Sequence, residues 1–170
     1  TLYNKGIIVN NGTISLGYFT TGKRASVLVN NGTIDNAGEN SKVEVSSYCE
    51  LYVGGTFANH SRQALEFISG SKIYSNIEIS SSEISGSGYT FVLRQDINSA
   101  GVKLEKDSYF YNGEERKPEV TVSLNGTKYY SSDYSTTYEN NIEVGTASVI
   151  LKATDKSKVF FGTRTLTFTI

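Results

Sequence analysis

The chain of 170 residues contains one cysteine, one proline, one histidine, and no methionine or tryptophan. A single cysteine excludes an internal disulfide, and we expect Cys49 to be a small buried side chain. No apolar run approaches the roughly 20 residues that span a bilayer as a helix, so membrane insertion is not expected. We find no signal peptide. Thr1 already lies in a strand-like pattern, so we expect a fragment or a processed product.

Charge is also scarce. Charged residues make up 19% of the chain and the formal net charge is -1. No basic patch stands out, so nucleic acid is not an expected partner. The composition is nevertheless too apolar for simple disorder, because 38% of the residues are hydrophobic.

The residues that are abundant favour strands. The chain has 12 tyrosines and 8 phenylalanines, and valine, isoleucine and threonine dominate the patterned stretches. No helical period extends beyond a turn, and the best helix candidate is weak and covers residues 61–68. The sequence therefore predicts an all-β protein.

A repeat marks the first half of the chain. Asn-Asn-Gly-Thr-Ile occurs at 10–14 and again at 30–34, and a looser Gly-Gly-Thr-Phe follows at 54–57. Each copy follows a short alternating strand. Asn and Gly suit sharp corners, so the pattern predicts short coils that stack as a parallel β-solenoid. The alternative is an antiparallel sandwich, since Asn-Gly is also a strong hairpin signal.

The spacing of the two identical strings makes specific predictions about packing. It pairs Ile7 with Val27, Val9 with Val29 and Ile14 with Ile34 in ladders inside the solenoid. It also predicts matching corners at Gly12 and Gly32, with positive φ. The residues expected to form buried stacks are Ile7, Val9, Val27, Val29, Leu51 and Val53.

The pattern changes near residue 95. From 96 to 170 we expect an antiparallel meander of strands about 8 to 12 residues apart, which is typical of a β-sandwich. Turn signals occur at 112–113, 125–126, 140–141 and 161–163. The expected core comprises Val120, Val122, Val149, Leu151, Leu166 and Phe168. We therefore predict a solenoid segment of about four coils at 1–95, expected to be the end of a longer solenoid, and a second domain at 96–170.

Motifs in the second half support a family resemblance. In order they are Tyr-Phe-Tyr-Asn-Gly at 109–113, Lys-Pro-Glu-Val-Thr-Val at 117–122, Asn-Gly at 125–126, Asp-Tyr at 133–134, Tyr-Glu-Asn-Asn at 138–141, Val-Gly-Thr-Ala at 144–147, Phe-Gly-Thr at 161–163 and Phe-Thr-Ile at 168–170. This stretch resembles the bacterial immunoglobulin-like repeat of clostridial-type cell-surface proteins. It departs from that pattern at Phe161, where the family usually has tyrosine, and in the loop at 154–159, which lacks the usual glycines.

The resemblance implies an immunoglobulin-like sandwich that serves as a spacer or stalk, with no shared catalytic residues. The first half resembles β-helical surface proteins and phage tail spikes in general. Together these resemblances imply an extracellular or cell-surface protein, with a virion as the alternative.

Few residues could carry chemistry. One histidine, His60, and one cysteine exclude the usual zinc sites, and the Ca²⁺ repeat Gly-Gly-x-Gly-x-Asp is broken at residues 54–57. We predict no cofactor and no metal. Glycosidases need two facing carboxylates, and no such pair recurs on one face in the predicted coils. The carboxylates considered are Asp35, Glu39, Glu44, Glu50 and Glu66.

We therefore expect a non-catalytic structural or adhesive segment of a bacterial surface or secreted protein. Its expected partners are cell-surface glycans or proteins, contacted through exposed tyrosines at Tyr48, Tyr52 and Tyr74. The alternative is that these tyrosines only cover the wall of the solenoid. One alternative is a distal piece of a phage tail or capsid fibre that binds the host surface. The other is a fragment of a β-helical polysaccharide lyase or hydrolase. A monomer is expected, or a homotrimer if the chain comes from a phage fibre.

Overall fold

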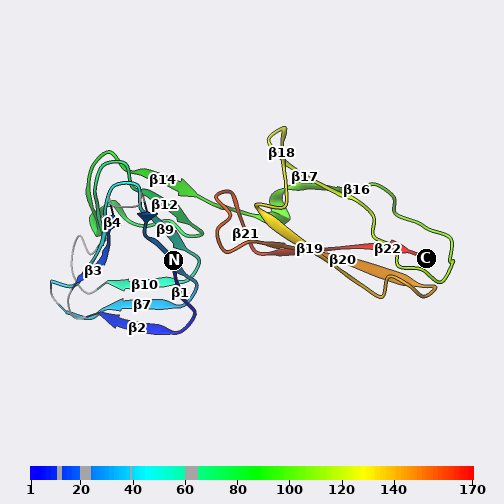
Figure 1. Ribbon diagram of the computed structural model, residues 1–170, viewed down its shortest axis with the longest axis horizontal. Helices are drawn as coiled ribbons and strands as arrows, with labels where there is room; N and C mark the ends of the chain where they lie inside the picture. The colour runs from blue at the N-terminus through cyan, green and yellow to red at the C-terminus, as the bar shows by residue number, and fades with distance from the viewer. Residues whose placement is uncertain (11–12, 20–23, 39, 60–64) are drawn as a thin grey trace. The chain divides into compact units, whose positions relative to one another are not determined.

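The computed structural model describes residues 1–10, 13–19, 24–38, 40–59 and 65–170. The predictions for Gly12, Glu39 and His60 lie outside these residues. The chain divides into two compact units, Thr1–Arg94 and Gln95–Ile170. We call them the solenoid-like unit and the antiparallel unit (Figure 1).

The solenoid-like unit consists of stacked coils. Each of the first three coils contributes one strand to each of three parallel sheets. Sheet A contains β1 (Leu2–Asn4), β6 (Val27–Asn30), β9 (Glu50–Val53), β12 (Lys72–Ser75) and β14 (Thr90–Leu93). Sheet B contains β2 (Ile7–Asn10), β7 (Thr33–Asn36) and β10 (Thr56–Asn59). Sheet C contains β3 (Thr13–Leu16), β8 (Lys42–Val45), β11 (Leu65–Phe67) and β13 (Ile84–Gly86).

Two smaller elements complete the unit. Strands β4 (Tyr18–Phe19) and β5 (Arg24–Ala25) form an antiparallel pair. A short 3₁₀ turn, η1 (Ser81–Glu83), is closed by a capping box between Ser80 and Glu83. Residues 65–67 are strand and not helix, so the weak helix candidate is wrong there.

The parallel pairing of these sheets excludes the antiparallel alternative for this part of the chain. One side of each strand points into a shared interior, as strand alternation requires. The fully buried interior residues come from all three sheets and include Leu28, Ile34, Val43, Leu51, Leu65 and Ile73. Cys49 is buried in the same cluster, as expected, and burial raises the pKa of its thiol.

The coils are longer than the spacing of the two Asn-Asn-Gly strings predicts. Asn4 lies 26 residues before its register partner Asn30. The looser copy at 54–57 does align with the string at 30–34, because Thr33 is the register partner of Thr56, 23 residues later. Asn10 does not pair with Asn30 but with Asn36. The first asparagines of the two strings therefore lie in different sheets, because Asn10 ends β2 of sheet B and Asn30 ends β6 of sheet A. The predicted ladders of Ile7 with Val27, Val9 with Val29 and Ile14 with Ile34 are wrong.

This register shift changes which side chains point inward. Val29, Leu51 and Val53 are buried as predicted, although Val29 lies on the outer face of sheet A, in a small second cluster. Ile7 and Val9 are 75% and 59% exposed, because they face outward from β2. Val27 is only partly buried.

Gly32 is also not required for the predicted reason, since its φ is not positive. A Cβ at this position would lie closer than 3.0 Å to the carbonyl oxygen of Gly6 in the preceding coil. The glycine is required by close packing of the backbone between coils.

The antiparallel unit has two three-stranded antiparallel sheets. The first contains β16 (Gly101–Leu104), β17 (Val120–Leu124) and β18 (Thr127–Tyr129). The second contains β19 (Tyr134–Glu139), β20 (Thr146–Ala153) and β22 (Thr163–Thr169). The remaining elements are η2 (Ile97–Ser99) and a short parallel pair of β15 (Gln95–Asp96) with β21 (Phe160–Phe161).

The turn and core predictions hold in this unit. Asn125 and Gly126 have φ of 49° and 81° between β17 and β18, as expected for a two-residue hairpin turn. Val122 from the first sheet and Leu151 from the second are buried in one cluster. Among the other predicted core residues, Val149 and Phe168 are buried, and Val120 and Leu166 pack partly buried against the clusters.

Candidate functional site

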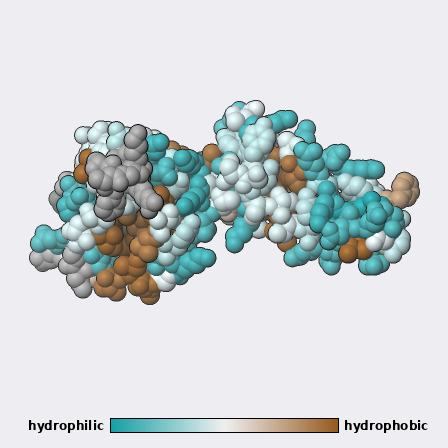
Figure 2. All heavy atoms as spheres, viewed as in Figure 1, coloured by the Kyte–Doolittle hydropathy of each residue, from teal (hydrophilic) through white to brown (hydrophobic). Residues whose placement is uncertain are grey.

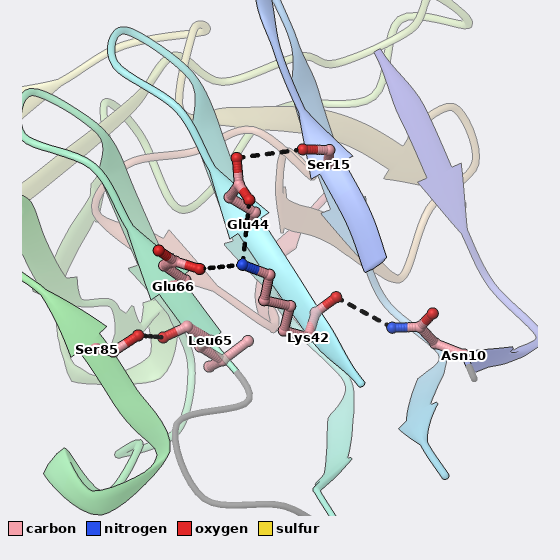
Figure 3. A network of polar contacts seen from close by, with 7 residues as sticks. All are labelled: Asn10, Ser15, Lys42, Glu44, Leu65, Glu66 and Ser85. Atoms are coloured by element: carbon pink, nitrogen blue, oxygen red, sulfur yellow. Dashed lines mark hydrogen bonds and ion pairs between the residues drawn. The ribbon is translucent and has the colours of Figure 1, made fainter. Parts of the chain in front are cut away.

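A row of polar side chains crosses the outer face of sheet C (Figure 3). Val43, Val45, Leu65 and Phe67 are buried, so alternation turns the residues between them outward. The strand register then aligns four polar residues side by side on β3, β8, β11 and β13. They are Ser15, Glu44, Glu66 and Ser85.

Lys42 binds both carboxylates of this row. Its Nζ lies 3.4 Å from Glu44 Oε2 and donates a hydrogen bond to Glu66 Oε2. The hydrogen bond to Glu66, together with the second carboxylate, raises the pKa of the Lys42 ammonium. Ser15 Oγ donates to Glu44 Oε1 at 3.4 Å.

Two hydrogen bonds from side chains to backbone carbonyls flank the ion pair. The backbone carbonyl of Lys42 accepts from Asn10 Nδ2 at 3.1 Å, which ties β8 to the corner after β2. Ser85 Oγ donates to the backbone carbonyl of Leu65 at 3.5 Å. The residues of the row thus come from four successive strands of sheet C, and hydrogen bonds or ion pairs connect each of them to a neighbouring strand.

The geometry of the row limits its chemistry. Glu44 and Glu66 are register partners on neighbouring strands, and such strands lie about 4.8 Å apart across a sheet. A retaining glycosidase also uses two neighbouring carboxylates. However, the Lys42 ammonium occupies the position between them that a reacting sugar would need. The row is suited to holding adjacent coils together by ion pairing.

This pair was not expected from the sequence. No facing carboxylate pair was predicted on one face of the coils, whereas the structure brings Glu44 and Glu66 together on one face. Asp35 lies opposite Val9 on sheet B, and Glu50 accepts a hydrogen bond from Tyr52 on sheet A. The sequence feature that could have predicted this pair is the spacing between Glu44 and Glu66, which equals the length of one coil. This feature can be recognised only once the coil length is known.

Two of the three tyrosines expected at the surface are buried. Tyr52 is 1% exposed and Tyr74 is 6% exposed, whereas Tyr48 is 68% exposed. The expectation that Tyr52 and Tyr74 are exposed is therefore wrong.

Packing on the outer face of sheet A explains their burial. The Tyr52 and Tyr74 rings stack with centroids 4.8 Å apart, and they form a small cluster with Val29. The Arg94 guanidinium lies 5.9 Å from the centre of the Tyr52 ring, and the Tyr52 hydroxyl donates to Glu50 Oε2 at 3.0 Å. Burial, reinforced by the Glu50 carboxylate, strongly raises the pKa of Tyr52.

The described residues offer no metal site. In the described parts of the chain, no group of three or more His, Cys, Asp or Glu side chains could hold a metal ion. None of the helices described there is long and apolar enough to cross a membrane. Comparisons with protein-family models, with curated proteins and with solved structures find no match to this chain.

Proposed function

We propose that this chain is a non-catalytic structural and adhesive segment of an extracellular or cell-surface bacterial protein. The observation that carries the proposal is the Lys42 bridge, because a lysine already lies between the two members of the one aligned carboxylate pair described on sheet C. Two units with separate cores also suit a stalk built from modules.

We further propose that the antiparallel unit is an immunoglobulin-like sandwich. Two antiparallel sheets that contribute to shared buried clusters support this proposal, as does the ordered series of motifs between 109 and 170. Such a domain in a surface protein acts as a spacer. The expected solution state is a monomer, and a trimer in sedimentation experiments would favour the phage-fibre alternative.

Adhesion requires exposed side chains that can contact a glycan or a protein. With Tyr52 and Tyr74 buried, the tyrosine that remains from the expected set is Tyr48. Exposed aromatic side chains also occur in the antiparallel unit, at Phe110 and Tyr130. Aromatic rings stack on the apolar faces of sugars, so these residues are the proposed points of contact.

A glycan array tests adhesion. We expect selective binding that Tyr48→Ala or Tyr130→Ala weakens, with Tyr52→Phe as the control, because its ring is buried and retained. Binding that is unchanged in both alanine variants would place the contact elsewhere. An array without any binding would remove adhesion and leave the spacer role.

One observation favours a second candidate function, glycoside cleavage, namely the alignment of Glu44 with Glu66. Polysaccharide turnover should be measured for the wild type, for Glu66→Gln and for the control Glu78→Gln, which alters an exposed carboxylate off sheet C. We expect no turnover by any of them. Turnover that Glu66→Gln abolishes and Glu78→Gln preserves would overturn the non-catalytic proposal.

A further inference from the structure

The first coil leaves one end of the solenoid-like unit open. Strands β1, β2 and β3 are outermost in sheets A, B and C, and among the described strands each pairs on one side only. Leu2 and Leu28 are register partners, yet Leu2 is 52% exposed and Leu28 is 0% exposed. Figure 2 shows hydrophobic surface over β2 and its neighbours, where Ile7 is exposed. Open strand edges beside uncovered apolar side chains favour the addition of further strands.

Gly6, Gly32 and Gly55 form a column at one corner of successive coils, and this column indicates what could pack against the open end. A Cβ on Gly32 would lie closer than 3.0 Å to the carbonyl oxygen of Gly6, and a Cβ on Gly55 equally close to that of Gly32. Gly32 and Gly55 must be glycine because a backbone carbonyl of the preceding coil occupies the space that a Cβ would need. Gly6 continues the column, yet a Cβ there would meet nothing within 4 Å, and its φ is not positive. Nothing in the described structure requires glycine at position 6.

The opposite end of the column is a natural control. Ser75 pairs with Val53, so the register places Ile77 beside Gly55. Asn76 N still donates to Val53 O at 2.8 Å, but residues 77–79 form no strand and β10 is the outermost strand of sheet B on this side. Where a side chain replaces glycine, the sheet ends. At Gly6 the corner remains open to another coil.

The asparagines at the same corner have a consistent polarity. Asn4 Nδ2 donates to Asn30 Oδ1, in the following coil, at 2.8 Å. Asn4 Oδ1 accepts from Gly6 N at 3.1 Å, and a carbonyl oxygen can accept a second hydrogen bond. The Asn4 side chain is buried at the open end. An asparagine in a preceding coil could donate to Asn4 just as Asn4 donates to Asn30.

From these observations we propose that the open end is a docking surface for one further parallel β-coil, supplied by the same polypeptide on the N-terminal side of β1. Its strands pair with β1, β2 and β3. Its corner places a backbone carbonyl over Gly6 and a side-chain donor over Asn4, and its apolar side chains cover Leu2.

A second copy of this chain fits the surface less well. Two copies related by a twofold axis would pair β1 with β1 in antiparallel orientation, which has a different hydrogen-bond pattern from the parallel stack. A head-to-tail contact would place Leu93 over Asn4, because Leu93 holds the equivalent position on β14, the outermost strand of sheet A at the other end. Neither arrangement combines the parallel register of the stack with a side-chain donor to Asn4 Oδ1.

The test adds a coil of known geometry. A copy of residues 27–49 is fused directly before Thr1, so that the copied Asn30 and Gly32 fall over Asn4 and Gly6. Amide hydrogen exchange of β1 and β2 is then compared with that of the original chain. We expect protection to rise at least about tenfold in the extended chain. Gly6→Ala should abolish this gain, yet leave exchange and melting temperature unchanged in the original chain, where a Cβ has room. Gly32→Ala is the control, and it should destabilise both chains.

Three results would overturn the proposal. The first is an added coil that leaves β1 and β2 unprotected. The second is Gly6→Ala tolerated equally in both chains. The third is an original chain that sediments as a dimer with β1 and β2 already protected and that Gly6→Ala converts to a monomer, because a second copy would then be the occupant.

Discussion

The two units of this protein pair their strands over different distances along the chain. In the antiparallel unit, β17 and β18 are joined by the two-residue turn at Asn125 and Gly126. In the solenoid-like unit, neighbouring strands come from successive coils, with Asn4 beside Asn30, 26 residues away. A local turn signal therefore determines pairing in one unit, whereas the other depends on the length of a whole coil.

This difference also affects how each unit tolerates change. A hairpin register is set by its turn. A stacked coil has no such turn between paired strands, so inward-pointing asparagines and tightly packed glycines at the corners set its register. Substitutions at these corners should damage the solenoid-like unit alone.

The largest expected effects test whether the units are energetically separate. Leu51 and Leu151 are both 0% exposed, one in each unit. Each change to alanine should cost about 2 to 5 kcal/mol through lost burial and the cavity left behind. Hydrogen exchange with mass spectrometry should show Leu51→Ala loosening residues 1–94 only and Leu151→Ala residues 95–170 only. Loosening of both units by either change would contradict two separate cores.

The corner glycines give the next largest effect. Gly32→Ala should destabilise the solenoid-like unit by about 1 to 3 kcal/mol, because the new Cβ forces the backbone of Gly6 to move. Gly17→Ala is the matched control, since a Cβ there meets nothing within 4 Å and its φ is not positive. Urea unfolding monitored for each unit would measure both. Equal stability of the two variants would remove close coil packing as the reason for Gly32.

The sequence was sufficient for the class of fold and for much of the antiparallel unit. Alternating valines and leucines, with Asn-Gly between them, correctly predicted the β17–β18 hairpin and the burial of Val122 and Leu151. Parallel stacking was also correctly predicted from the repeated strings, although only the copies at 30–34 and 54–57 are aligned in the structure. These signals are local, and side-chain alternation and turn chemistry are enough to interpret them.

The coil register and the polar row could not be predicted in the same way. Asn10 and Asn30 begin identical strings but end strands of different sheets, so matching the strings gives a coil that is too short and turns Ile7 inward. That error separated Glu44 from Glu66. The burial of Tyr52 and Tyr74 escaped prediction because it depends on contacts between coils and with Arg94, which no local pattern encodes.

Alkaline pH should weaken the solenoid-like unit through Tyr52. Its pKa is strongly raised in the folded state, so it stays neutral while the unfolded chain ionises above about pH 10. The contribution of Tyr52 to the free energy of unfolding is therefore fully present below pH 10 and falls by about 1.4 kcal/mol per pH unit above it. Burial raises the pKa of Tyr134 in the antiparallel unit in the same direction. Urea unfolding between pH 9 and 11 should show the decline in residues 1–94, and Tyr52→Phe should flatten it. A decline that persists in Tyr52→Phe would assign it to another group.

The smallest expected effect concerns the polar row. Lys42→Met should lower the stability of the solenoid-like unit only slightly, because the ion pairs are partly exposed and screened by salt. The loss should shrink at high salt concentration. Lys152→Met, in the antiparallel unit, is the control and should have no such salt dependence. A loss for Lys42→Met that is independent of salt would indicate packing and not ion pairing.

The coil register is the central claim, and contacts between methyl groups test it most directly. In a methyl-labelled sample, nuclear Overhauser effects report side chains that lie within a few ångströms. The structure predicts a cross-peak between Ile8 and Ile34, which are register partners. It predicts none between Ile7 and Val27, because Ile7 faces outward from β2. Cross-peaks joining Ile7 to Val27 and Val9 to Val29, without one between Ile8 and Ile34, would contradict the register and the account built on it.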